Sequence, residues 1–292
     1  HFIDKELDFG PDNYKPIPVV LSKAKGVWVW DVDNNKYLDM MSAYSAVSHG
    51  HSHPELLKVL HEQSSRLALT SRAFYTDTLG SFLETITSLS NFDMALPMNS
   101  GAEAVETAIK AARRWGYRSK NIKSGKAEII VADGNFHGRT TTIISFSSSP
   151  NSKEDFGPLT PGFISVEFGS AKAIGEMINE NTAAVLIEPI QGEGGIIVPP
   201  ENYLPEVREL CTKNNVLMIL DEVQSGLGRT GKMFAFEHSN IQPDGLILGK
   251  ALGGGFMPVS CFLSSSEVMQ WLTPGSHGST FGGNPLAAAI GK

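Results

Sequence analysis

The stretch Val216-Leu217-Met218-Ile219-Leu220-Asp221-Glu222 decides the fold class of this chain. Five apolar residues that lead directly into two acids predict a strand buried on both faces, with Asp221 at its carboxyl end. A carboxylate in that place is costly to bury unless it meets a cation. A helix cap and a metal ligand are the alternatives that these residues leave open.

Further apolar runs on both sides of this stretch predict a series of strands separated by helices. Strands are expected at residues 128–132, 142–146, 184–188, 216–221, 245–248 and 259–263. Helices are expected after His53-Pro54, at 102–117, 171–179 and 203–213, and from Asn284 onward. Strands rich in Val, Ile and Leu that alternate with helices are typical of an α/β fold whose mostly parallel sheet is covered on both faces. Ligands of such sheets bind at the carboxyl ends of the strands.

A β-hairpin is expected near the N-terminus. Residues 27–30 and 36–39 alternate in the manner of strands, and Asp33-Asn34-Asn35 between them is a turn signal. We therefore divide the chain into an N-terminal segment with a hairpin, residues 1–50, and one large domain, residues 51–292.

The composition narrows the class of protein. The chain has 292 residues, 41% of them hydrophobic, and a net charge of -7. That charge, with no run of Lys or Arg, argues against a nucleic-acid partner. No apolar run approaches the ~18 residues that span a bilayer, so we expect no membrane partner. Cys211 and Cys261 show neither disulfide nor metal spacing, which favours the cytoplasm, or the mitochondrial matrix if a presequence was removed.

A second unusual stretch, Leu248-Gly249-Lys250-Ala251-Leu252-Gly253, follows another predicted strand. Most lysines extend to solvent, whereas Lys250 ends an apolar run. A lysine that loses its water shell binds its proton less tightly and becomes a nucleophile toward aldehydes. The glycines let the backbone pass close to a bound ring. Together with Asp221, this pattern predicts a catalytic lysine.

A third stretch, Asn99-Ser100-Gly101-Ala102-Glu103, opens a predicted helix. The first N–H groups of a helix have no intrahelical partner, so a small-residue turn there is suited to bind phosphate. An ordinary capping box of Ser100 and Glu103 is the alternative.

Two further patterns resemble known binding motifs but lack their context. The segment Gly226–Met233 satisfies GxGxxG and GxxxxGK, yet Met233 has no hydroxyl for Mg²⁺, and the glycines do not follow the first strand directly. His49, His51 and His53 alternate but have no cysteine or acid beside them, so we expect no metal ion.

Six motifs in this order resemble the class-III aminotransferases, which depend on pyridoxal 5′-phosphate. They are SGAEA, FHGRT, EPIQGEGG, LDEVQSGLGRTGK, LGKALGGG and STFGGNP, and the resemblance runs from about Asn13 to Pro285. It implies the fold of type I pyridoxal-phosphate enzymes, with a C-terminal small domain that this chain does not contain. A non-catalytic interaction protein on the same scaffold is the alternative from another class, and the intact Lys250 and Asp221 argue against it.

The resemblance also implies a role for each matching residue. Lys250 would hold the cofactor as a Schiff base and then move the substrate proton. Asp221 would keep the ring nitrogen protonated, so that the ring acts as an electron sink. The other implied cofactor contacts are Gln224 to the ring hydroxyl, Phe136 and Val223 to the ring faces, His137, and Ser100, Gly101 and Ala102 to the phosphate. Thr280 would reach the phosphate of the neighbouring subunit, which implies at least a homodimer.

The N-terminal segment resembles the ornithine-specific branch of the family. There, residues that match Tyr14 and Arg139 receive the α-amino and α-carboxylate groups, Tyr44 matches a gating tyrosine, and Glu193 matches a glutamate that masks a second arginine. The implied substrates are ornithine and 2-oxoglutarate. That second arginine belongs to the small domain, so we expect the chain as written to complete the 2-oxoglutarate half-reaction poorly. Gly195 stands where the branch has alanine. Acetylornithine, 4-aminobutyrate and semialdehyde substrates remain alternatives.

Overall fold

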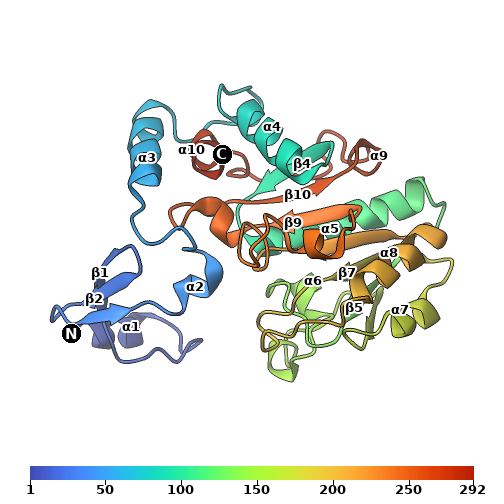
Figure 1. The fold of residues 1–292 in the computed structure, drawn as a ribbon, viewed down its shortest axis with the longest axis horizontal. Coiled ribbons are helices and arrows are strands. Elements are labelled where there is room, and N and C mark those ends of the chain that lie inside the picture. The colour runs from blue at the N-terminus through green and yellow to red at the C-terminus, as the bar shows by residue number, and fades with distance from the viewer.

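The computed structural model describes residues 1–292 and is built around one seven-stranded sheet (Figure 1). The strand order is β4-β10-β9-β8-β7-β5-β6. The bounds are β4 (Met94–Met98), β5 (Glu128–Ala132), β6 (Phe163–Val166), β7 (Thr182–Ile187), β8 (Leu217–Asp221), β9 (Gly245–Leu248) and β10 (Ser260–Ser264). Strands β9, β8, β7, β5 and β6 are parallel neighbours, and β10 runs antiparallel to both β9 and β4.

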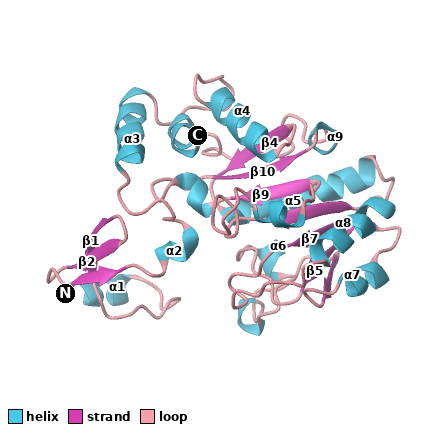
Figure 2. Cartoon of the chain, in the orientation of Figure 1, coloured by secondary structure: helices cyan, strands magenta, loops and turns pink.

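Helices cover both faces of this sheet, as Figure 2 shows. Side chains alternate along a strand, so one strand supplies both layers of the core. In β8, Met218 and Leu220 pack in one hydrophobic cluster and Leu217 and Ile219 in the other. The first cluster includes α4 (Leu79–Ser90), α7 (Ala171–Met177), α8 (Tyr203–Lys213) and α10 (Pro285–Gly291); the second includes α5 (Gly101–Arg118), α6 (Thr141–Ile144) and α9 (Ser266–Met269).

The N-terminal segment forms a separate small sheet at the side of the large one (Figure 1). Helix α1 (Phe2–Phe9) precedes three antiparallel strands, β1 (Leu21–Lys25), β2 (Trp28–Asp31) and β3 (Lys36–Leu38). Helix α3 (Pro54–Arg66) then leads toward the large sheet. The short turn α2 (Ser42–Ser45) between them is left-handed, with positive φ at all four residues. Non-glycine residues adopt that backbone at a cost of about 1–2 kcal/mol each.

Most of the predicted elements are present, and the α/β class is confirmed. The strands at 128–132 and 245–248 and the helix at 203–213 have the predicted bounds. The hairpin is confirmed as β2 and β3. No helix in the structure has the length and apolar character that crossing a membrane requires.

One predicted strand is wrong. Residues 142–146 lie in and just after the short helix α6, because the Thr140 side chain accepts the Ile143 N–H and caps a helical turn. The apolar pair Ile143 and Ile144 is buried there in helical form. A short apolar run is compatible with either structure, and here the cap decides.

Several elements were missed by the sequence reasoning. They are α1, β1, α2, α4, β4, β6 and α9. Strand β4 contains Pro97, which removes a backbone donor and is tolerated because β4 is at the edge of the sheet. Strand β6 has only four residues, and Ser165 interrupts its apolar run.

Candidate active site

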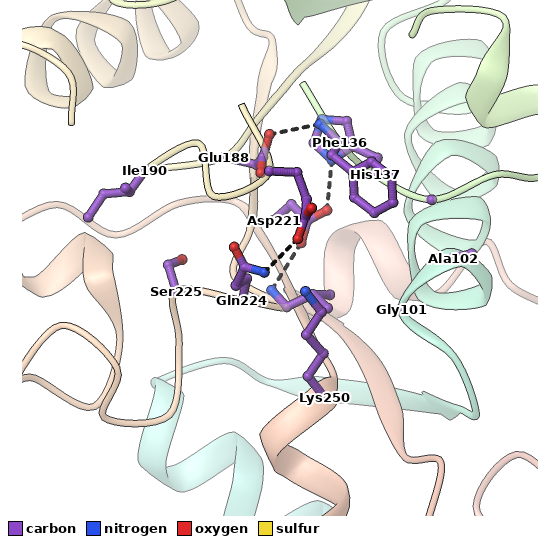
Figure 3. A pocket seen from close by; sticks show the side chains of 13 residues that line it. Gly101, Ala102, Phe136, His137, Glu188, Ile190, Asp221, Gln224, Ser225 and Lys250 are labelled. Atoms are coloured by element: carbon purple, nitrogen blue, oxygen red, sulfur yellow. Dashed lines mark hydrogen bonds and ion pairs between the residues drawn. The ribbon is translucent and has the colours of Figure 1, made fainter. Parts of the chain in front are cut away.

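A cavity of about 180 Å³ lies at the carboxyl ends of β7, β8 and β9 (Figure 3). Asp221 is the last residue of β8, Glu188 follows β7 directly, and Lys250 comes two residues after β9. The lining residues are Gly101, Ala102, Phe136, His137, Gly138, Glu188, Ile190, Glu193, Asp221, Val223, Gln224, Ser225 and Lys250. This is the edge of a parallel sheet at which ligands bind. The structure thus brings most of the predicted site residues together.

Asp221 has two protein partners in this cavity. Its Oδ2 lies 2.7 Å from Nδ1 of His137, and its Oδ1 accepts the Val223 N–H at 3.0 Å. The side chains of Asp221 and His137 are 5% and 0% exposed. Burial alone would lower the pKa of His137, but the hydrogen bond to Asp221 and the charge of that carboxylate outweigh it and raise the pKa. The sequence analysis paired Asp221 with a cationic ligand and expected His137 at the cofactor, but it did not foresee the contact between these two side chains.

Lys250 projects into the cavity from a strained backbone. Its φ is 45°, which a non-glycine residue adopts rarely and which is typical of functional sites. Burial lowers the pKa of the Lys250 ammonium, and the carboxylates of Glu193, Asp221 and Glu188 oppose that shift. An amine in this environment loses its proton more readily and is therefore a better nucleophile.

The turn before α5 forms the predicted capping box. Ser100 accepts the Glu103 N–H at 3.2 Å, and Glu103 in return accepts the Ser100 N–H at 2.7 Å. Capping by Ser100 does not prevent anion binding, because Gly101 and Ala102 still line the cavity at the first turn of the helix. A Cβ at Gly101 would lie 2.9 Å from Cγ1 of Val223, so only glycine fits beside that valine.

The pair that the sequence reasoning assigned to the substrate, Tyr14 and Arg139, is assembled across 125 residues. Arg139 Nη1 donates to the Tyr14 hydroxyl at 3.2 Å. The guanidinium carbon of Arg139 also lies 5.3 Å from the centre of the Phe136 ring. A polar hollow of about 470 Å³ adjoins the Lys250 cavity and shares Phe136 and Glu193 with it. Arg139 and several serines line this hollow.

Glu193 and Tyr44 meet at Gln224. The Gln224 Nε2 donates to Glu193 Oε1 at 3.1 Å and to the main-chain oxygen of Tyr44 at 3.4 Å. The side chain of Tyr44 itself is 54% exposed.

Thr280 is the predicted site residue that lies apart from the others. It lines a separate polar hollow with Ser71, Arg72, Gly278 and Ser279. Ser279, beside it, accepts a hydrogen bond from Asn99 Nδ2 at 2.9 Å, so the loop of Thr280 is attached to the start of α5.

Comparison with known proteins agrees with this geometry. The family model for class-III aminotransferases matches residues 9–292. The chain belongs to the class-III aminotransferases. It is 58% identical to ornithine aminotransferase 2 of Staphylococcus saprophyticus, over 97% of this chain and 71% of that protein.

Solved structures show the same relationship. A crystal structure of the ornithine aminotransferase from Toxoplasma gondii, with pyridoxal phosphate at its active site in partial occupancy, matches with a TM-score of 0.97 and 44% identity. The match covers 99% of this chain and 68% of that one. The acetylornithine aminotransferase from Elizabethkingia anophelis matches with a TM-score of 0.89 and 50% identity, covering 99% of this chain and 70% of that one.

Class-III aminotransferases use pyridoxal 5′-phosphate, and the residues of this cavity fit that cofactor. An amine of lowered pKa, Lys250, faces the buried carboxylate of Asp221 across it. The first turn of α5 offers backbone donors at one end. The hydroxyl of Ser225 is buried in the lining without a hydrogen-bond partner, so the protein leaves a polar atom for a ligand.

Two buried glutamates beside the cavity were missed by the sequence reasoning. Glu188 accepts the Phe136 N–H at 3.0 Å, and burial raises its pKa to about 7. Glu222 accepts the N–H groups of Ala235 and Phe236, and burial likewise raises its pKa to about 7. Glu188 lines the cavity, whereas Glu222 holds the loop that follows β8. The acid at the end of the apolar run 183–187 was the available signal for Glu188.

The two misleading motifs have structural roles. His51 Nε2 lies 2.7 Å from Asp39 and joins the hairpin to the turn before α3. The glycine-rich segment after Ser225 forms turns in which Gly228 and Gly231 have positive φ.

Proposed function

We propose that this class-III aminotransferase transfers the δ-amino group of L-ornithine to 2-oxoglutarate, which yields glutamate 5-semialdehyde and glutamate. The observation that carries the proposal is the hydrogen bond between Tyr14 and Arg139, because Arg139 lines the polar hollow that adjoins the Lys250 cavity. A guanidinium paired with a phenol beside this hollow suits a ligand end that bears both a carboxylate and an amine. The relatives named as ornithine aminotransferases support the same substrate.

Lys250 is the proposed catalytic base. Bound pyridoxal phosphate supplies an electron sink that acidifies the substrate carbon next to the reacting nitrogen. Lys250 would hold the cofactor covalently, and its amine would move the proton that the substrate carbon loses. The lowered pKa of Lys250 suits this role, because a base works best when part of it is unprotonated at working pH.

Asp221 is proposed to act by its charge. A carboxylate that is 5% exposed keeps its full electrostatic effect on a ring nitrogen nearby. The contacts with His137 and with the Val223 N–H fix the orientation of Asp221, and each carboxylate oxygen keeps a second acceptor site for the ligand. In this proposal His137 touches the cofactor less directly than Asp221 does.

The remaining contacts hold the cofactor in place. Ser100, Gly101 and Ala102 bind the phosphate, Phe136 and Val223 flank the ring, and Gln224 reaches the ring hydroxyl. Residues 51–292 form the cofactor-binding domain in this proposal, and residues 1–50 form the segment that receives the substrate.

We also propose that the enzyme is a homodimer. Thr280 lines a polar hollow outside the Lys250 cavity, so it does not serve the cofactor of its own chain. A phosphate held by the neighbouring subunit would use its hydroxyl. Glu193 and Tyr44 complete the substrate end, with Glu193 exposed at the cavity rim and able to change partners between the two half-reactions.

Acetylornithine transamination is the second candidate, because the acetylornithine aminotransferase structure is 50% identical to this chain. The two substrates differ at the α-amino group, which is acylated in acetylornithine. The Tyr14 hydroxyl favours a free amine, to which it can be a hydrogen-bond partner.

The deciding experiment compares the two substrates on the purified holoenzyme. We expect L-ornithine to change the visible absorption of the bound cofactor and to give semialdehyde and glutamate with 2-oxoglutarate, at a higher kcat/KM than N-acetylornithine. A preference for N-acetylornithine or 4-aminobutyrate would overturn the ornithine assignment. No absorption change with any amine would overturn the transaminase assignment.

A further inference from the structure

Gln224 lies against a glycine that has no assigned role. Its amide is placed directly over Gly192, so that a Cβ built on Gly192 would fall 1.5 Å from Gln224 Oε1 and 2.6 Å from Cδ. All three of the nearest atoms belong to Gln224. The absence of a side chain at Gly192 therefore makes room for this amide.

The amide in this position connects two parts of the site. Its Nε2 donates to Glu193 at 3.1 Å and to the main-chain oxygen of Tyr44 at 3.4 Å, while Gln224 lines the cavity that contains Asp221 and Lys250 (Figure 3). Glu193 is exposed, and Gln224 is its one side-chain hydrogen-bond partner in the structure.

We propose that Gly192 is a positioning residue. Its lack of a side chain lets the amide of Gln224 lie where it holds Glu193 at the substrate end of the site and faces the cofactor at the other end. This inference rests on the proposed function, because it takes the cavity as the cofactor site. It predicts that a methyl group at Gly192 disturbs both ends at once.

Gly192 differs in this respect from the other glycines of its loop. Gly195 has φ +119°, so any side chain there strains the backbone. A Cβ at Gly194 would lie 3.0 Å from the main-chain oxygen of Gly134, which cannot move easily. Gly192 has no such φ, and its obstacle is the far end of a flexible side chain. An alanine at Gly192 should therefore displace Gln224 and leave the fold intact.

The position of Gln224 matters because it fixes the charge of Glu193 near Lys250. Glu193 is a carboxylate close enough to Lys250 to support its protonated form against burial. When the amide of Gln224 is displaced, Glu193 loses its anchor and turns to solvent. The protonated form of the cofactor–lysine linkage then loses a nearby negative charge, so its pKa should fall.

The test is a double-mutant cycle on the holoenzyme with Gly192→Ala, Gln224→Ala and the double variant. Each single variant should lose the hydrogen bond from Gln224 to the ring hydroxyl of pyridoxal phosphate. That loss should raise the Kd for the cofactor about three- to tenfold. The double variant should be no weaker than Gln224→Ala, because Gly192 acts only through that side chain. The pH midpoint of the visible cofactor band should move downward in Gly192→Ala.

Gly80→Ala is the matched control. Gly80 lies in α4 with nothing within 4 Å of its ideal Cβ, so both the Kd and the pH midpoint should equal those of the wild type. If Gly192→Ala fails to fold, Gln224→Ala in the same chain should restore folding.

Additive effects in the double variant, or wild-type behaviour of Gly192→Ala, would overturn the inference and leave the proposed function standing. So would a folding defect that Gln224→Ala does not repair. A wild-type protein that bound no pyridoxal phosphate would overturn the proposed function and the inference together.

Discussion

The carboxyl edge of the large sheet and the N-terminal segment hold their functional side chains in opposite ways. At the sheet edge, Asp221 and His137 are almost fully buried and hydrogen-bonded to each other. In the N-terminal segment, Tyr14 and Tyr44 are 60% and 54% exposed, and Tyr14 contacts Arg139 through one hydrogen bond and through the guanidinium that lies over its ring. From this difference we infer that the buried edge performs the chemistry and that the exposed segment selects the substrate. Substitutions at the sheet edge should slow the turnover of every substrate, whereas substitutions in the N-terminal segment should alter the preference among substrates.

The largest effect is expected from Lys250→Ala. The variant has no amine to attach the cofactor or to move the substrate proton, so turnover should be lost with every amine tested. Binding of pyridoxal phosphate should persist through the phosphate turn and Asp221, without the visible band of covalent attachment. Lys172→Ala, at an exposed ion pair on α7, is the control and should behave as wild type. Residual wild-type turnover in Lys250→Ala would contradict the assignment.

The next largest effect is expected from Asp221→Asn. The substitution keeps the shape of the side chain and removes the charge, and removal of a preorganised charge from a dry site typically costs ~10²–10³ in rate. Steady-state kcat with ornithine measures the effect. Glu222→Gln neutralises the adjacent buried acid, which faces the loop of Ala235 and Phe236, and should spare kcat by comparison. Equal losses in the two variants would show that Asp221 acts through stability alone.

A smaller and selective effect is expected from Tyr14→Ile. Leaving a polar group of the substrate without its partner costs ~1–3 kcal/mol, so the preference for ornithine over 4-aminobutyrate should fall about tenfold or more. The ratio of kcat/KM for the two amines is the measurement. Tyr14→Phe keeps the ring and removes only the hydroxyl that meets Arg139, so it should account for most of the change. An unchanged ratio would break the division of labour between the two regions.

The smallest effect is expected from Glu188→Gln. Burial raises the pKa of Glu188 from 4.5 to about 7, so the folded protein holds this proton more tightly than the unfolded chain. That contribution to stability is complete below pH about 4.5 and is lost as the pH rises through about 7. The variant carries no such charge, so its Tm should fall less than that of the wild type between pH 5 and pH 8, by a few degrees at most. Glu222 is present in both proteins, so part of the dependence of Tm on pH should remain in the variant. Identical curves of Tm against pH would mean that Glu188 does not titrate.

The strands could be predicted where burial leaves a continuous apolar signal. Strands β5 and β9 were recognised at their observed bounds, because their residues face two covered sides of the sheet. The same signal failed at Ile143 and Ile144, which are equally apolar but follow the cap of Thr140. It also failed for β4 at the sheet edge, where Pro97 interrupts the pattern.

The candidate site could be predicted in part for a related reason. Asp221 and Lys250 follow apolar strands directly, so their place at the carboxyl edge is readable from the chain. Glu188 occupies the same kind of position but was missed, because its motif was interpreted only through Glu193. The order of residues along the chain therefore identified the carboxyl edge of the sheet but only some of the functional residues that lie there.

The alternation of buried strands and helices could be inferred from the amino-acid sequence alone, and so could the sheet edge that carries Asp221 and Lys250. Those features depend on side-chain periodicity within a few residues, which any short window displays. Three contacts became visible only in the folded chain: His137 with Asp221, Tyr14 with Arg139, and Gln224 with Gly192. Each of these contacts joins residues 32 to 125 positions apart, so it depends on how whole elements pack and not on local pattern.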